Sequence, residues 1–191
     1  QTDICDWIVD NLLHLAAVVE TWHDGIDSPD LVACTPPGYR YVERARQRLD
    51  DGAAATTRTN HGGVWLFYVD KLHVRPVLLP DYDTFEHLCV YVQGSGLNTL
   101  VIVVYRPGSA SVTEAFFESL TDLLERTVVY KSVWILGDLN LHLDRANDTH
   151  TVKFQHVMSL FGLLQHVSSP THWSSVDDRS EERRVGKECC G

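Results

Sequence analysis

Five polar residues follow apolar runs of the sequence at positions where chemistry could take place. Glu20 comes directly after one apolar run, Tyr105 and Arg106 end a second, and Asp138 and Asn140 follow a third. Apolar runs of this length are typical of buried strands. In open α/β sheets, ligands bind beyond the carboxyl ends of the strands. The sequence therefore predicts a polar site where several strand ends meet.

The side-chain types suit a phosphate and a hard metal ion. A carboxylate such as Glu20 provides the oxygen ligands that Mg²⁺ prefers. The phenol of Tyr105 and the guanidinium of Arg106 can both donate hydrogen bonds to a phosphate oxygen. Taken singly, Glu20 is better explained as a solvated strand end, and Tyr105 as an aromatic core residue before a turn.

The pair Asp138 and Asn140 is harder to explain by packing. Residues two apart in an extended segment point to the same side, so a carboxylate and an amide would face one substrate. The carboxylate could orient an attacking water, and the amide could donate to the phosphoryl group. Gly137 allows the backbone to approach closely.

Hydrophobic periodicity predicts the elements that position these residues. Strands and helices alternate, and two strands around a glycine-containing link predict a hairpin, so an α/β sandwich is favoured over a purely parallel sheet. We expect helices over residues 4–15 and 151–166 and behind the capping-box pattern Ser111-Val112-Thr113-Glu114, strands over residues 15–19, 63–69, 85–92, 97–105 and 132–136, and loops over residues 27–37 and 44–60.

The composition permits a packed domain and limits the function classes. Of 191 residues, 44% are hydrophobic and 22% charged, which is typical of a globular core. The formal charge of −10 argues against a non-specific nucleic-acid binder, because such proteins usually present a basic footprint. No apolar run has the length of a membrane span. The first residues show no signal peptide, so we expect an intracellular protein whose natural start lies upstream of Gln1.

Four short motifs occur in one order along the chain. They are Glu20-Thr21-Trp22, Tyr105-Arg106-Pro107, Gly137-Asp138-Leu139-Asn140 and Pro170-Thr171-His172. In this order they resemble the endonuclease/exonuclease/phosphatase superfamily, and within it the endonuclease domains of non-LTR (LINE-like) retrotransposons. The resemblance covers about residues 1–175.

The resemblance implies a fold as well as an activity. The fold is α/β, a DNase I-like sandwich of two mixed β-sheets flanked by helices, here truncated at both ends. The domain would span residues 1–176. Residues 177–191 would form a non-native or disordered tail, because Arg179–Cys189 resembles a translated sequencing adapter.

The family's roles transfer to the matching positions of this sequence. Glu20 would bind Mg²⁺, with Mn²⁺ as an alternative, and Tyr105 would hydrogen-bond the scissile phosphate. Asp138 would orient or deprotonate the attacking water, and Asn140 would stabilise the transition state. Thr171 would contact the phosphate backbone of the substrate, and Arg106 would either contact a phosphate or support the loop.

The implied activity is metal-dependent phosphodiester hydrolysis that nicks DNA. A reverse transcriptase domain would belong to the same full-length polyprotein, which would act in the nucleus. The family's first-strand Asn and its final Ser-Asp-His segment have no counterpart in these residues, so we expect the chain as given to be nearly inactive.

Two alternatives remain open. A phosphomonoesterase or phospholipase of the same superfamily would share Glu20, Asp138 and Asn140. A non-catalytic remnant of a decayed element would share the fold and lack the activity.

Overall fold

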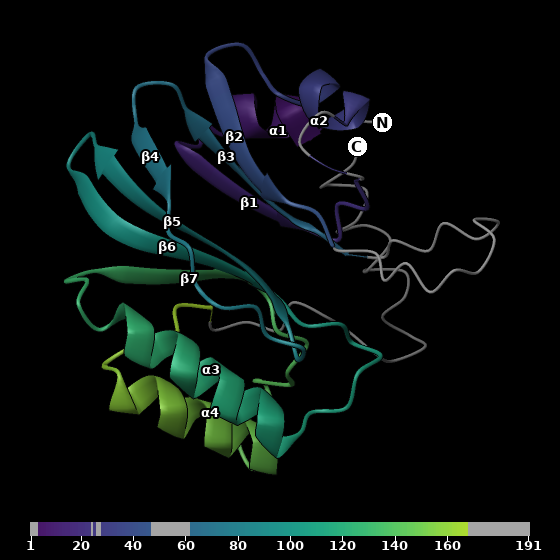
Figure 1. Ribbon diagram of the computed structural model, residues 1–191, viewed down its shortest axis with the longest axis vertical. Coiled ribbons are helices and arrows are strands. Elements are labelled where there is room, and N and C mark those ends of the chain that lie inside the picture. The colour runs from purple at the N-terminus through teal and green to yellow at the C-terminus, as the bar shows by residue number, and fades with distance from the viewer. Residues whose placement is uncertain (1–3, 24, 26–27, 47–61, 168–191) are drawn as a thin grey trace, which may run out of the picture. The chain divides into compact units, whose positions relative to one another are not determined.

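The computed structural model of the chain describes residues 4–23, 25, 28–46 and 62–167 (Figure 1). Contacts divide the chain into two compact units, one formed by His14–Asn140 and the other by the residues on either side of it. The described elements are α1 (Ile4–Asp10), β1 (Leu15–Val19), α2 (Pro29–Ala33), β2 (Tyr39–Arg44), β3 (Val64–Val69), β4 (His73–Pro76), β5 (Glu86–Gly94), β6 (Leu97–Tyr105), α3 (Glu114–Thr127), β7 (Val133–Asp138) and α4 (Thr149–Leu160).

All seven of these strands belong to the unit His14–Asn140 and form two sheets. The first has the strand order β1-β3-β2 and the second the order β4-β5-β6-β7. Neighbouring strands are antiparallel except for β6 and β7, which are parallel. The predicted sandwich of two sheets flanked by helices is confirmed. The first sheet is antiparallel throughout and only the second is mixed.

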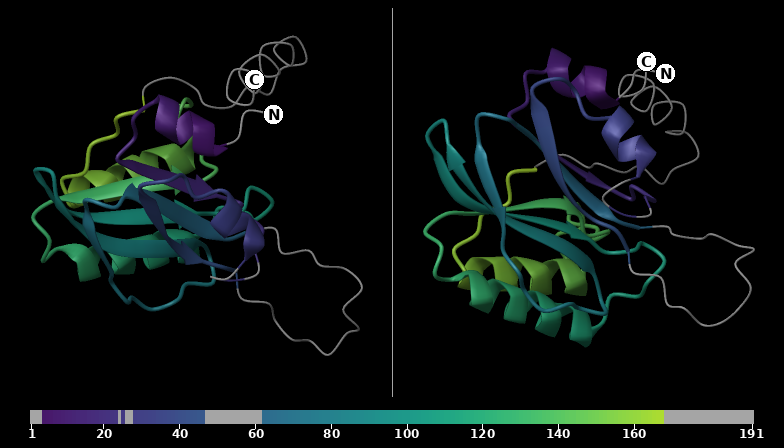
Figure 2. Two further views of the ribbon diagram at one scale, coloured as in Figure 1. Left: turned by 90° about the horizontal axis from the view of Figure 1, so that it is seen from above. Right: turned by 45° about the horizontal axis from the view of Figure 1, so that its top comes forward.

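A shared apolar core joins the two sheets, which form separate layers in Figure 2. Alternate residues of the central strands point to the same face of a sheet. The fully buried members of this core are Val64 and Leu66 of β3, Val90 and Val92 of β5, and Val101 and Val103 of β6. Burying one such side chain stabilises the folded chain by roughly 1.5–3 kcal/mol.

Helix α3 covers the other face of the second sheet (Figures 1 and 2). In its first turn, the ring of Phe116 packs edge-to-face against Phe85, the residue before β5, with centroids 6.0 Å apart. The helical period behind the capping-box pattern predicts an apolar face of Val112, Phe116, Leu120, Leu123 and Leu124. The last four are buried, whereas Val112 precedes the helix.

The helix N-terminus is also placed differently from the capping-box prediction. Thr113, not Ser111, is the N-cap, and its hydroxyl accepts a hydrogen bond from the Phe116 N–H. Glu114 is then the first helical residue. A carboxylate there cannot close a capping box, which needs the acidic residue at the third helical position.

Helix α4 belongs to the second unit and is shorter than predicted. It begins after Asp148, whose carboxylate accepts from the N–H groups of His150 and Thr151 at 3.0 Å. The helix ends at Leu160, not His166. The helical period predicts an apolar side of Phe154, Val157, Leu160, Phe161 and Leu164. Phe154 and Val157 are buried, but Leu160 and Leu164 are 65% and 80% exposed.

Three further boundaries differ from the sequence prediction. Helix α1 ends at Asp10 and does not reach Leu15. The loop expected over residues 27–37 contains the short helix α2, which has proline at its start. The loop expected from Arg44 onwards begins one residue too early, because Arg44 is paired with Val64 at the end of β2. Strand β2 was not predicted, because apolar and polar residues alternate only weakly in its sequence, Tyr-Arg-Tyr-Val-Glu-Arg.

The N-cap assignment predicts which of two hydroxyls stabilises α3. Replacing Thr113→Ala removes the acceptor for the Phe116 N–H and should lower the free energy of unfolding by about 1 kcal/mol. Ser111→Ala is the matched control and should change it by less than ~0.5 kcal/mol. Urea denaturation followed by circular dichroism measures both. A larger loss of unfolding free energy in Ser111→Ala than in Thr113→Ala would show that Ser111 is the N-cap.

Candidate active site

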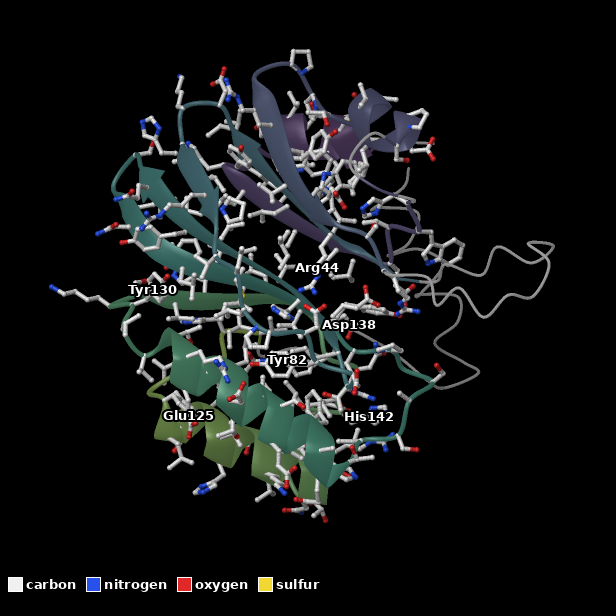
Figure 3. All side chains as sticks on the ribbon, viewed as in Figure 1. Arg44, Tyr82, Glu125, Tyr130, Asp138 and His142 are labelled. Carbon is white, nitrogen blue, oxygen red and sulfur yellow. The ribbon has the colours of Figure 1, made fainter. Side chains whose placement is uncertain are left out.

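The predicted site residues lie where β1, β6 and β7 end. In the parallel pair of β6 and β7, Tyr105 is the register partner of Asp138. Figure 3 labels Asp138 at the end of β7. Glu20 follows the last residue of β1 in the other sheet. The Tyr105 hydroxyl donates a hydrogen bond of 2.5 Å to Glu20 Oε1, so the two sheets meet in one polar contact at this edge.

Gly137 makes the close approach of β7 to β6 possible. It has φ +114°, and an added Cβ would lie 2.0 Å from the Val104 carbonyl oxygen. Only glycine adopts this backbone conformation without strain. The register that sets Asp138 beside Tyr105 therefore depends on Gly137.

The segment after β7 turns sharply. Asn140 has φ +49°, so the extended geometry expected for Asp138–Asn140 is wrong. The turn brings the Asn140 N–H to 2.7 Å from Asp138 Oδ1. The amide Nδ2 of Asn140 donates to the Arg106 carbonyl at 2.8 Å. Asp138 and Asn140 are thus adjacent through a local turn.

Arg106 supports this turn from inside. Its side chain is 3% exposed and its N–H groups donate to carbonyl oxygens on two segments. The acceptors are those of Leu139 at 2.7 Å, Asn140 at 2.5 Å, Ala110 at 2.5 Å and Pro107 at 3.2 Å. Burial lowers the pKa of the guanidinium, and the charge of Asp138 opposes that shift. The structure places Arg106 behind the site, where it holds the loops.

A pocket of about 550 Å³ opens at these strand ends. It includes three of the residues singled out in the sequence, namely Glu20, Tyr105 and Asn140. Asp138 is exposed beside it, two residues before Asn140. Thr171 lies outside the described residues. The full lining is Glu20, Trp22, Arg46, Tyr105, Pro107, Gly108, Ser109 and Asn140.

Arg46 is a site residue that the sequence prediction missed. It lines the pocket, and its guanidinium lies 5.8 Å from the centre of the Tyr105 ring. It also forms an ion pair with Glu86, whose other oxygen accepts from the Gly63 N–H at 2.6 Å. The only sequence signal was the spacing of Arg44 and Arg46, since residues two apart at a strand end share a side.

A buried network holds the segment that follows Glu20. The Thr21 hydroxyl and His23 Nδ1 are 2.6 Å apart, and His23 Nε2 lies 2.6 Å from Glu43 Oε2. His23 is 3% exposed. A Cβ on Gly63 would lie 2.6 Å from the Thr21 hydroxyl, so no larger residue fits there. The network ties this segment to β2 and β3.

The environment of Tyr105 fixes its protonation state. Burial and the hydrogen bond to the nearby Glu20 carboxylate raise the pKa of Tyr105 to about 12. The phenol therefore stays protonated at neutral pH and remains a hydrogen-bond donor. Because the folded pKa exceeds its ordinary value of 10.0, this group stabilises the fold below about pH 10. That contribution is lost as the pH rises through about 12.

The pocket's chemistry suits a magnesium ion. Its lining provides oxygen ligands in the Glu20 carboxylate, the Asn140 amide and the Ser109 hydroxyl. Within the described ranges, no three His, Cys, Asp or Glu side chains cluster as a metal site. Mg²⁺ fits such a sparse donor set, because it is usually held by one or two carboxylates together with waters and substrate phosphates.

Comparison with known proteins identifies the fold. Models of known protein families give no match to the sequence, and curated proteins give none. Among solved structures, the chain is similar to an AP endonuclease from Leishmania major, with a TM-score of 0.58 and 15% identity over 95% of this chain and 70% of that one. It is also similar to the human Nocturnin catalytic domain with bound sulfate. There the TM-score is 0.53 and the identity 14%, over 82% of this chain and 59% of that one.

Both neighbours have the DNase I-like fold of the endonuclease/exonuclease/phosphatase proteins, and the chain has this fold too. The chain spans less than two thirds of the length of the Nocturnin domain. In the described part of the chain, no helix is both long and apolar enough to cross a membrane.

The contact between Glu20 and Tyr105 predicts a change in the tyrosine titration. Glu20→Gln removes the negative charge, so the pKa of Tyr105 should fall from about 12 towards its ordinary value and stay above it because burial remains. The difference in ultraviolet absorbance between each chain and its Tyr105→Phe counterpart isolates this phenol from Tyr82, whose pKa is also raised to about 12.

Glu125→Gln is the control for that titration, since Glu125 is exposed on α3. It should leave the Tyr105 titration unchanged. Circular dichroism at each pH checks that the chain is still folded. An unchanged Tyr105 midpoint in Glu20→Gln would show that the two side chains do not meet in solution.

Proposed function

We propose that this chain belongs to a metal-dependent phosphodiesterase domain that nicks DNA, and that the chain as given retains only weak activity. The observation behind the proposal is the meeting of Glu20, Tyr105 and Asn140 in one pocket, with Asp138 at its edge. These residues are separated by up to 120 positions in the sequence and come from strands of different sheets. Packing alone gives no reason for a carboxylate, a phenol and an amide to converge at the ends of apolar strands.

Each side chain has a role that its contacts allow. Asp138 would accept the proton of the attacking water, because Oδ1 is held by the Asn140 N–H and Oδ2 is the oxygen left to act as a base. Tyr105 would donate its hydroxyl hydrogen to a phosphate oxygen. Asn140 would donate its second amide hydrogen there, since the first goes to Arg106. Donors fixed before the reaction stabilise charge that develops in the transition state.

Glu20 would hold Mg²⁺ through its carboxylate. When bound, this ion neutralises charge on the phosphate and stabilises the leaving oxygen. The hydroxyl of Tyr105 would then be released from Glu20 to the substrate. In the overall reaction, a bond forms between phosphorus and the water oxygen, the bond from phosphorus to the leaving oxygen breaks, and the proton of the water goes to Asp138.

The choice of DNA as substrate is supported by the four ordered sequence motifs and by the fold shared with an AP endonuclease. The four sequence motifs alone are the support for a further proposal, that the chain belongs to a retrotransposon polyprotein, beside a reverse transcriptase and acting in the nucleus. Residues 1–176 would form the endonuclease domain, and Thr171, outside the described residues, would contact the DNA backbone.

Plasmid nicking tests the proposed activity directly. With enzyme in excess over supercoiled plasmid and with Mg²⁺ present, we expect slow relaxation. Asp138→Ala should reduce its rate by about 10²–10⁴-fold, the usual contribution of a general base. Glu20→Gln should raise the Mg²⁺ concentration needed for half of the maximal rate.

The matched control is Asp70→Asn, which removes an exposed carboxylate from the turn after β3. It should leave the nicking rate and the Mg²⁺ requirement unchanged. Relaxation that persists in EDTA, or at an equal rate in the Asp138→Ala chain, would contradict the assignment and indicate a contaminating nuclease.

A further inference from the structure

Trp22 has no role in the hydrolysis described above, yet it lines the same pocket as Glu20 and Tyr105. Its side chain is 56% exposed. Indole rings are usually well buried in folded proteins, because they remove a large apolar surface from water. An exposed indole at the mouth of a polar pocket therefore suggests a ligand with an apolar face.

The backbone is strained to present this ring. Glu20 and Trp22 have φ values of +55° and +51°, a conformation that is a clear outlier for bulky residues. Such strain persists only where the surroundings enforce it, and it is concentrated at functional sites. Here the Trp22 N–H donates to the Gly62 carbonyl at 2.8 Å, and the buried pair of His23 and Glu43 holds the segment from behind.

A cation lies on the same rim. Arg46 lines the pocket with Trp22 and also lines a second pocket of about 460 Å³, which Phe85 and Phe116 line as well. The ion pair with Glu86 holds the guanidinium in place. A charged group that faces two pockets is suited to a ligand with more than one phosphate. A phosphomonoester of a sugar alcohol would offer no flat ring to Trp22.

We propose that Trp22 is a stacking surface for a nucleobase next to the scissile phosphate, and that Arg46 binds the adjacent phosphate of the same strand. The inference rests on the proposed phosphodiesterase function and specifies its substrate as a polynucleotide with an accessible base. Stacking on an aromatic ring tolerates any base, since every base has a flat face. It also explains how a chain with a formal charge of −10 can hold a polyanion, because stacking does not depend on charge.

Binding of two oligonucleotides separates base stacking from phosphate contact. The probes are fluorescein-labelled single strands of about 12 nucleotides. One has bases throughout, and the other has stable tetrahydrofuran residues in place of the central nucleotides. All chains contain Asp138→Ala so that the probes remain intact, and fluorescence anisotropy in Mg²⁺ gives the Kd.

We expect Trp22→Ala to raise the Kd of the base-containing probe by about tenfold, within the range measured for loss of one stacked base. The Kd of the tetrahydrofuran probe should not change. Trp22→Phe keeps a ring and should restore binding to within about threefold. The matched control is Trp134→Ala, which removes an exposed indole of β7 that does not line the pocket.

Arg46→Gln should weaken both probes and reduce the dependence of log Kd on log salt by about 0.7, the contribution of one phosphate contact to a single strand. Equal effects of Trp22→Ala on the two probes, or no effect on either, would overturn the stacking inference. Cleavage of the base-containing probe by the chain with intact Asp138, in excess over the probe, tests hydrolysis separately. If this probe stays intact while its binding still depends on Trp22, the proposed function is refuted and the stacking site stands.

Discussion

The hydrogen bond from Tyr105 to Glu20 is the contact on which the site depends. It joins the end of β6 to the end of β1, and these strands belong to different sheets. The apolar core between the sheets fixes their separation, so this polar contact forms only when the sandwich is packed correctly. In the second sheet, the close approach at Gly137 sets Asp138 beside Tyr105. The geometry of the pocket therefore follows from the packing of the whole unit His14–Asn140.

The chain keeps unfavourable backbone conformations at this edge. Glu20, Trp22 and Asn140 are all left-handed without being glycine. Two of the three are held by neighbours that stability alone would not require. The pair of His23 and Glu43 lies behind Trp22, and Arg106 donates hydrogen bonds to the loop carbonyls of Leu139 and Asn140. Strain supported in this way is typical of sites whose side chains must be positioned before a ligand arrives.

Much of the fold could be predicted from the sequence because its central strands are apolar and continuous. The periodicity of apolar residues is sufficient to predict the hairpin of β5 and β6 and the apolar face of α3. Strand β2 and Arg46 could not be predicted, because a half-buried strand with interspersed charged residues is locally indistinguishable from a polar loop. The helix cap was misplaced by two residues, since serine and threonine are both good caps by type and only the structure shows that the Phe116 N–H donates to the Thr113 hydroxyl.

The site prediction succeeded and failed for similar reasons. Glu20, Tyr105 and Asn140 were identified because each ends an apolar run, and the structure brings them to one pocket. Arg106 carries the same signal but faces inward, because its neighbours leave several carbonyl groups that need donors. The turn at Asn140 depends on the hydrogen bond that the Asn140 N–H donates to the Asp138 carboxylate. The periodicity of a strand cannot reveal such a bond.

The central claim is that strand ends far apart in sequence share one cation. Paramagnetic broadening by Mn²⁺ tests this claim most directly. In a ¹⁵N-labelled chain, the backbone amides of Glu20, Gly108 and Asn140 should lose intensity together at low Mn²⁺ concentrations, while those of Asp70–Leu72 are spared. Glu20→Gln should abolish the effect at all three positions. Broadening confined to one of these segments, or unaffected by Glu20→Gln, would contradict a shared metal site.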